Sequence, residues 1–114
     1  MSDELDIQTD EFLKGMACLK AGHPTEGAEL LRKAAFAGHA EAQNQLARLY
    51  FVTLRSHKDL ADLEVSAQSG DHVALFVLAM SFLEGRVVEK DHEKALSALR
   101  QAADGGNFMA MKML

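Results

Sequence analysis

The sequence predicts an all-α fold, an α-solenoid in which three repeats of antiparallel helix pairs stack in a row and a terminal helix follows. Three observations predict it. Hydrophobic residues make up 48% of the 114 residues, with abundant alanine and leucine and no tryptophan, a composition that favours helices over strands. A short segment rich in alanine and glycine recurs three times. Apolar residues on both sides of each recurrence follow the i, i+3, i+4 spacing of a helix face.

The recurring segment divides the chain into repeats. Its copies occupy residues 35–42, 67–74 and 103–110. The glycine in each copy follows the previous one at spacings of 32 and 36 residues: Gly38, Gly70 and Gly106. One helix pair cannot bury its own apolar face, whereas stacked neighbours can. We therefore expect a single helical-repeat domain over 9–114, with repeats at about 9–39, 40–71 and 72–107 and a terminal helix at 108–114.

The first repeat is delimited by residues that start and stop helices. A first helix is expected from Thr9 to Ala21, with Thr9 or Asp6 as its N-cap and a glycine directly after it. Pro24 suits the first turn of a second helix, which is expected to reach Ala37. Residues 1–8 form an acidic N-terminal segment, which we interpret as a solvated tail near the positive end of the first helix.

The remaining elements follow from the same signals. Helices are expected at about 40–53, 58–69 and 72–84, and residues 85–90 form a loop. Asp91 is the predicted cap of a sixth helix that reaches Asp104, and a seventh helix begins at Asn107.

The third repeat carries a recognisable pattern. From Ala74 to Asn107 it reads AxxxLAxxFxxGxVVxxDxxKAxxxLRQAADGGN and resembles a Sel-one-like repeat, a relative of the tetratricopeptide repeat. The second repeat departs from this pattern after Tyr50, because its loop is about four residues short and Asp59 stands where the third repeat has Ala95. The first repeat is nearer a plain tetratricopeptide repeat. The resemblance implies a right-handed α-solenoid whose first helices line a concave groove that holds protein partners.

The resemblance also implies which side chains face that groove. The predicted partner-binding residues lie on the first helices of the second and third repeats and on the terminal helix: Asn44, Arg48, Phe51, Phe76, Met80, Leu83, Lys112 and Met113. The three apolar residues from helix 72–84 have an alternative role in the core. That helix is apolar nearly all round, and such a helix is buried by something, either its neighbours or a partner.

Charge and hydropathy exclude several classes of protein. The net charge of −5 resides in residues 1–11, and the rest of the chain balances 12 acids against 12 bases. Without a basic stripe, nucleic-acid binding is not expected. The longest apolar run has eight residues, too short for a membrane span, and no secretory signal is visible. Cys18, the only cysteine, is expected to be a buried, inert thiol, which with the other features favours a cytoplasmic protein.

The sequence carries no catalytic motif. The five histidines show no HExxH or i, i+4 pairing, so no metal site is expected, and glycine loops for phosphate or dinucleotide cofactors are absent. We expect a non-catalytic protein–protein interaction module that binds a peptide or protein surface. The resemblance to Sel-one-like repeats implies an adaptor, chaperone or regulator, most often bacterial. The alternatives are an inhibitor or immunity-type protein that neutralises a toxin or enzyme, and an enzyme of unforeseen type.

The last residues are unusually apolar for a solenoid, which normally finishes with a polar capping helix. Phe108, Met109, Met111, Met113 and Leu114 follow the last repeat glycine. Three readings stay open: the chain is a fragment of a longer array, the helix folds back as a cap, or it pairs with another chain. We favour a homodimer through this Met-rich C-terminal helix.

Overall fold

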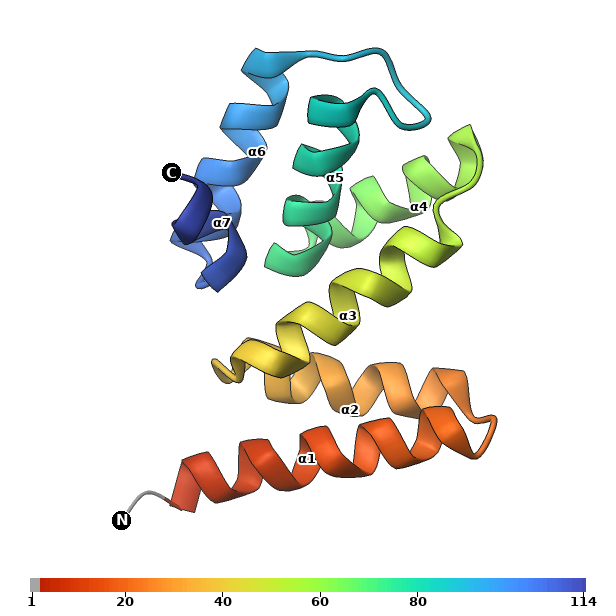
Figure 1. The fold of residues 1–114 in the computed structure, drawn as a ribbon, viewed down its shortest axis with the longest axis vertical. Coiled ribbons are helices and arrows are strands. Elements are labelled where there is room, and N and C mark those ends of the chain that lie inside the picture. The colour runs from red at the N-terminus through yellow and green to blue at the C-terminus, as the bar shows by residue number, and fades with distance from the viewer. Residues whose placement is uncertain (1–2) are drawn as a thin grey trace. The chain divides into compact units, whose positions relative to one another are not determined.

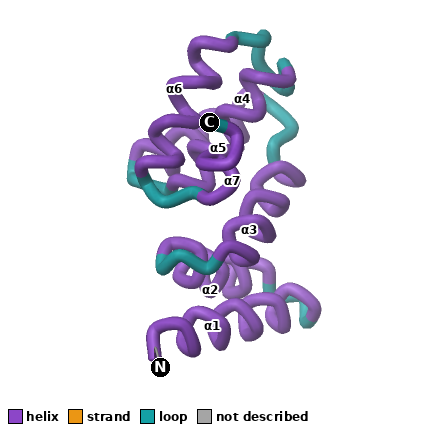
Figure 2. Tube along the Cα trace, turned by 60° about the vertical axis from the view of Figure 1, so that its left-hand side comes forward, coloured by secondary structure: helices purple, strands orange, loops and turns teal. Residues whose placement is uncertain are grey.

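A computed structural model describes residues 3–114, with side chains from Thr9 onward, and its described part consists of α-helices joined by short turns and loops, without strands (Figures 1 and 2). The helices are α1 (Asp3–Lys20), α2 (Pro24–Phe36), α3 (Ala40–Thr53), α4 (His57–Gln68), α5 (His72–Glu84), α6 (His92–Asp104) and α7 (Phe108–Met113). The all-α prediction is confirmed, and the predicted bounds from α2 to α7 agree with the structure to within one residue.

The prediction for the first helix is wrong at its start. α1 begins at Asp3, so Asp6 and Thr9 lie inside the helix and neither is its N-cap. Acidic residues are stabilising near the positive N-terminus of a helix, so the run of carboxylates extends α1 and does not precede it as a tail. The acidic segment at 1–8 otherwise lies outside the described residues, since residues 1–2 and the side chains of 3–8 are not described.

The predicted turn signals are present in the structure. Gly38, Gly70 and Gly106 have φ values of 103°, 99° and 100°, so the same left-handed turn closes α2, α4 and α6. Five of the described helices follow a residue whose side chain accepts a hydrogen bond from a backbone N–H of the first turn, which is an N-cap. The five caps are His39, Ser56, Asp71, Asp91 and Asn107.

The chain divides into two compact units, residues 1–46 and 47–114. In the first unit α1 and α2 form a closely packed pair that runs in opposite directions (Figure 1). Leu31, Ala34 and Ala35 of α2 are fully buried. A Cβ added at Gly15 would lie 3.1 Å from the carbonyl oxygen of Gly27, which shows how closely the two helices approach.

The second unit is built around α5. Closely packed pairs are formed by α4 with α5, α5 with α6, and α6 with α7, whereas α3 and α4 are not such a pair. From α5, the side chains of Val73, Ala74, Val77 and Ala79 are fully buried. The near-continuous apolar surface of α5 is therefore explained largely by packing inside this unit.

Phe76 is only 7% exposed and lies in the core, which is the alternative role that the sequence left open for it. The expectation that Cys18 is buried needs correction. Cys18 on α1 is only partly buried.

Candidate functional site

The predicted groove residues are distributed over both units. Asn44 lies in the first unit and the other seven lie in the second. Arg48, Lys112 and Met113 are exposed. Asn44, Phe51, Met80 and Leu83 are partly exposed, and Phe76 is in the core. The described structure therefore leaves seven of the eight side chains with some access to solvent.

Phe51 already has a contact inside the second unit. The guanidinium of Arg86, from the loop between α5 and α6, lies 5.6 Å from the centre of the Phe51 ring. The same guanidinium donates a hydrogen bond of 2.7 Å to the carbonyl oxygen of Phe51. Sequence reasoning did not identify Arg86, because its partner is 35 residues away and follows no periodic pattern.

A groove runs along α5 between α4 and α6, with a volume of about 270 Å³, and we call it the α5 groove. Leu75 and Phe82, which are partly exposed, provide its apolar floor, and Leu78 lies between them, nearly buried at 7% exposure. The α4 wall consists of Glu64, Ala67 and Gln68, and the α6 wall consists of Lys94, Ser97, Ala98 and Gln101. Ala67 and Ala98, on opposite walls, have small side chains, and Leu75 and Phe82 stay partly exposed on the floor.

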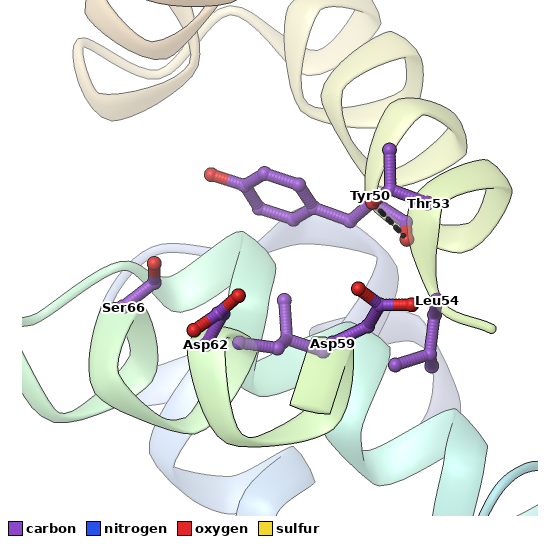
Figure 3. Close-up of a pocket in the computed structure, with 7 residues that line it drawn as sticks. Tyr50, Thr53, Leu54, Asp59, Asp62 and Ser66 are labelled. Atoms are coloured by element: carbon purple, nitrogen blue, oxygen red, sulfur yellow. Dashed lines mark hydrogen bonds between the residues drawn. The ribbon is translucent and has the colours of Figure 1, made fainter. Parts of the chain in front are cut away.

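A second hollow, the Tyr50 pocket, lies between α3 and α4 in the second unit and has a volume of about 200 Å³. The ring of Tyr50 extends from α3 above α4, which carries Asp59, Asp62 and Ser66 (Figure 3). Thr53, Leu54 and Leu63 complete the lining, and no basic side chain lines the pocket. The pocket exists because α3 and α4 are not closely packed against each other.

The carboxylate of Asp71 fixes the position of the Tyr50 ring. Its Oδ2 accepts a hydrogen bond from the Tyr50 hydroxyl. Its Oδ1 accepts hydrogen bonds from the backbone N–H groups of Val73 (3.0 Å) and Ala74 (3.1 Å), which caps α5. One buried carboxylate thus starts α5 and holds the aromatic wall of the pocket. The sequence indicated Tyr50 only as a packing residue.

The Asp59 carboxylate has a local structural role at the start of α4. Its Oδ2 accepts a hydrogen bond of 3.0 Å from the backbone N–H of Arg55, while the backbone N–H of Asp59 donates to the Ser56 hydroxyl. The Arg55 N–H lowers the pKa of Asp59 below its usual range, and partial desolvation opposes that effect. Asp59 is therefore held as a carboxylate. The guanidinium of Arg55 donates from Nε to the carbonyl oxygen of Val52 at 3.3 Å.

Asp62 differs from Asp59 because its side chain is exposed and is not committed to a cap. In the part of the chain with described side chains, no basic residue forms an ion pair with either carboxylate. The pocket therefore combines an aromatic face, two hydroxyl groups and two acidic groups. Such a lining can take up positive charge.

Neither a metal centre nor a membrane span is found among the described residues. No three His, Cys, Asp or Glu side chains gather in an arrangement that could hold a metal ion. None of the described helices combines the length and hydropathy needed to traverse a bilayer. Comparison of the chain with family models, with curated proteins and with solved structures gives no match.

Proposed function

We propose that the chain is a non-catalytic protein-binding module that holds an amphipathic helix of a partner protein in the α5 groove. The apolar floor between two polar walls, on which Leu75 and Phe82 are partly exposed beside the nearly buried Leu78, is the observation that carries this proposal. Contiguous apolar surface rimmed by polar residues commonly marks an interaction site. The role as an adaptor, chaperone or regulator in the cytoplasm, and the right-handed stacking of the helix pairs, belong to the same proposal and rest on the resemblance to Sel-one-like repeats.

The spacing of the floor residues supports a helical ligand. Leu75, Leu78 and Phe82 stand at i, i+3 and i+7 on α5, which covers about 10 Å at 1.5 Å per residue. This length corresponds to two turns of a second helix laid along α5. Helices that bind in such grooves present anchors at i, i+3 or i+4, and i+7.

The rim charges give the partner helix a direction. Glu64 stands on the α4 wall and Lys94 on the α6 wall, where its ammonium group lies 5.6 Å from the centre of the Phe82 ring. A partner helix with a basic side chain toward Glu64 and an acidic one toward Lys94 complements both walls. The reversed arrangement places like charges together and is disfavoured.

Selection of peptides from a random display library against the whole chain tests the proposal. We expect amphipathic helical peptides whose affinity falls at least about tenfold when Ser97→Trp fills the groove, since loss of a well-packed apolar anchor is worth more than about 1.4 kcal/mol. Arg100→Trp is the matched control, because Arg100 is exposed on α6 and does not line the groove.

A second pair of substitutions separates the α5 groove from the concave groove implied by the family resemblance. Asn44→Ala combined with Arg48→Ala should leave both the fold and the binding of the selected peptides unchanged, since solvent-facing changes cost under about 0.5 kcal/mol. Peptides that lose binding to this variant and bind Ser97→Trp normally would assign the site to the concave groove. Failure to select any peptide would contradict the proposed function itself.

A further inference from the structure

We propose that the Tyr50 pocket binds the cationic end of a long side chain, a guanidinium in preference to an ammonium, supplied by the protein that the module binds. This inference deepens the proposed function and rests on it for the source of the side chain. The juxtaposition that carries it is an aromatic ring fixed above two acidic side chains in a cavity without a basic lining residue.

The size of the pocket suits one side chain. At about 30 Å³ per molecule, a volume of about 200 Å³ corresponds to roughly seven waters. Pockets for drug-sized ligands are typically about 300–1,000 Å³, so the Tyr50 pocket is small for a metabolite. The apolar side chains of Leu54 and Leu63 provide contact for the methylene stem of an arginine or lysine.

The chemistry of the lining selects the charge and shape of the ligand. A cation over the Tyr50 ring is attracted by the negative face of the π-system. A guanidinium is planar, so it stacks on the ring and donates two parallel hydrogen bonds to one carboxylate, which an ammonium group cannot do. Asp62 is the carboxylate on α4 that is not committed to a cap, and the hydroxyls of Thr53 and Ser66 are further acceptors in the lining.

The fixed ring reduces the cost of binding. The hydroxyl of Tyr50 is tied to the Asp71 carboxylate, which itself is held by two backbone N–H groups of α5. Asp59 is also held by the hydrogen bond that its carboxylate accepts from the backbone N–H of Arg55. Side chains that are already ordered lose little conformational freedom when a ligand arrives.

The test uses the whole chain labelled with ¹⁵N and titrated with arginine amide, lysine amide and norvaline amide, each acetylated on its α-amino group so that only the side chain can carry charge. We expect saturable shifts of the backbone amides of Thr53, Asp62 and Ser66 with arginine amide at millimolar concentration, weaker shifts with lysine amide, and no matching shifts with the uncharged stem of norvaline amide. Salt should weaken the binding because part of it is electrostatic.

A pair of variants removes one negative charge inside the pocket and one outside it. Asp62→Asn should raise the dissociation constant for arginine amide by about threefold to fivefold, as expected for the loss of a partly exposed ion pair. Glu93→Gln, on the exposed surface of α6 and outside both the Tyr50 pocket and the α5 groove, should leave the dissociation constant unchanged. If both variants weaken arginine amide binding equally, or if the amide shifts spread over the whole surface, the attraction is a general electrostatic one. Either result would contradict a binding site in the Tyr50 pocket.

A third experiment distinguishes between two sources of the cation, a side chain of the partner protein and a free small molecule. A peptide selected against the α5 groove and extended by an arginine should bind more tightly than the same peptide extended by norvaline, and the difference should vanish in Asp62→Asn. Arginine amide that binds the pocket while no arginine-extended peptide gains affinity would assign the site to a free small cation and contradict a protein source. If peptide binding fails altogether but arginine amide still saturates the pocket, the proposed function falls and the cationic site stands.

Discussion

Gly70 turns the chain from α4 into α5 with a φ of 99°, and apart from its own atoms and its two chain neighbours nothing lies within 4 Å of the position that a Cβ would occupy. The residue is therefore required by backbone conformation and not by crowding. Gly70→Val should lower the free energy of unfolding by about 1 kcal/mol or more, because a β-branched residue resists the left-handed region. Gln68→Val, on the exposed surface two residues earlier, is the control for the change in β-branching, and equal denaturant midpoints for the two variants would contradict this account of the turn.

His72 is a buried titratable group of the second unit and is 5% exposed. Its Nδ1 lies 3.4 Å from Nδ2 of Asn107, and a Cβ added at Gly105 would lie 2.9 Å from its Cβ. Burial lowers the pKa of His72 below its usual value, and the nearby Asp71 carboxylate opposes this effect. The first turn of α5 thus has a neutral imidazole enclosed by the turn that leads into α7.

This burial gives the stability a pH dependence of known sign. Because the folded state binds a proton less readily than the unfolded state, the contribution of neutral His72 is complete above about pH 6.5 and decreases as the pH falls through the lowered pKa. Melting temperatures between pH 7.5 and 5 should fall more steeply for the natural chain than for His72→Gln. The exposed His92→Gln variant should follow the natural chain, and identical slopes for all three would refute a buried neutral imidazole.

At the scale of elements, the helices that the sequence predicted well are those with strong end signals. Pro24, Asp91 and Asn107 each start a helix at the expected residue, since a fixed φ or a side-chain acceptor is a local property of the chain. α1 begins at Asp3, six residues before the predicted start at Thr9. The difference arises because carboxylates near a helix start are compatible with either a tail or a first turn. Sequence alone does not separate these two cases.

Asp91 gives a direct test of such an end signal. Its carboxylate accepts a hydrogen bond of 3.1 Å from the backbone N–H of Lys94 in the first turn of α6. Asp91→Ala should lower the free energy of unfolding by about 1 kcal/mol, the usual value of an N-cap. Asp104→Ala, at the other end of α6, should not destabilise the chain, because a carboxylate near a helix C-terminus is unfavourable. A denaturation series in which Asp91→Ala is as stable as the natural chain would show that this cap does not contribute.

The candidate sites were less predictable than the helices. Leu75 and Phe82 stand on the same apolar helix as fully buried residues of α5, so spacing alone does not show that they stay partly exposed. Their exposure depends on how far α4 and α6 stand apart. The Tyr50 pocket depends on a hydrogen bond between residues 21 apart and on the separation of α3 from α4, neither of which leaves a periodic signal.

At the scale of the whole molecule, the terminal helix bears on oligomeric state. α7 packs on α6 through a buried Ala110, while Phe108, Met111, Met113 and Leu114 are between 38% and 56% exposed. Pairing of two copies would bury these side chains, and complete burial of one methionine contributes about 1.5–3 kcal/mol. A two-fold arrangement places the same helix on both sides of the interface.

We therefore predict a dimer in sedimentation experiments at micromolar concentration. Met111→Lys combined with Met113→Lys should convert it to a monomer without lowering the melting temperature of the fold, because both side chains are exposed within one copy. If the natural chain sediments as a monomer, the predicted dimer is wrong and α7 is an intramolecular cap of α6.

The central claim is that a partner helix lies along α5, and mapping of backbone amide shifts on binding of a selected peptide tests it most directly. The account predicts that the largest shifts fall within 64–68, 75–82 and 94–101, the three segments that line the groove. Shifts concentrated instead at Asn44, Arg48, Lys112 and Met113, with the α5 groove unchanged, would contradict it.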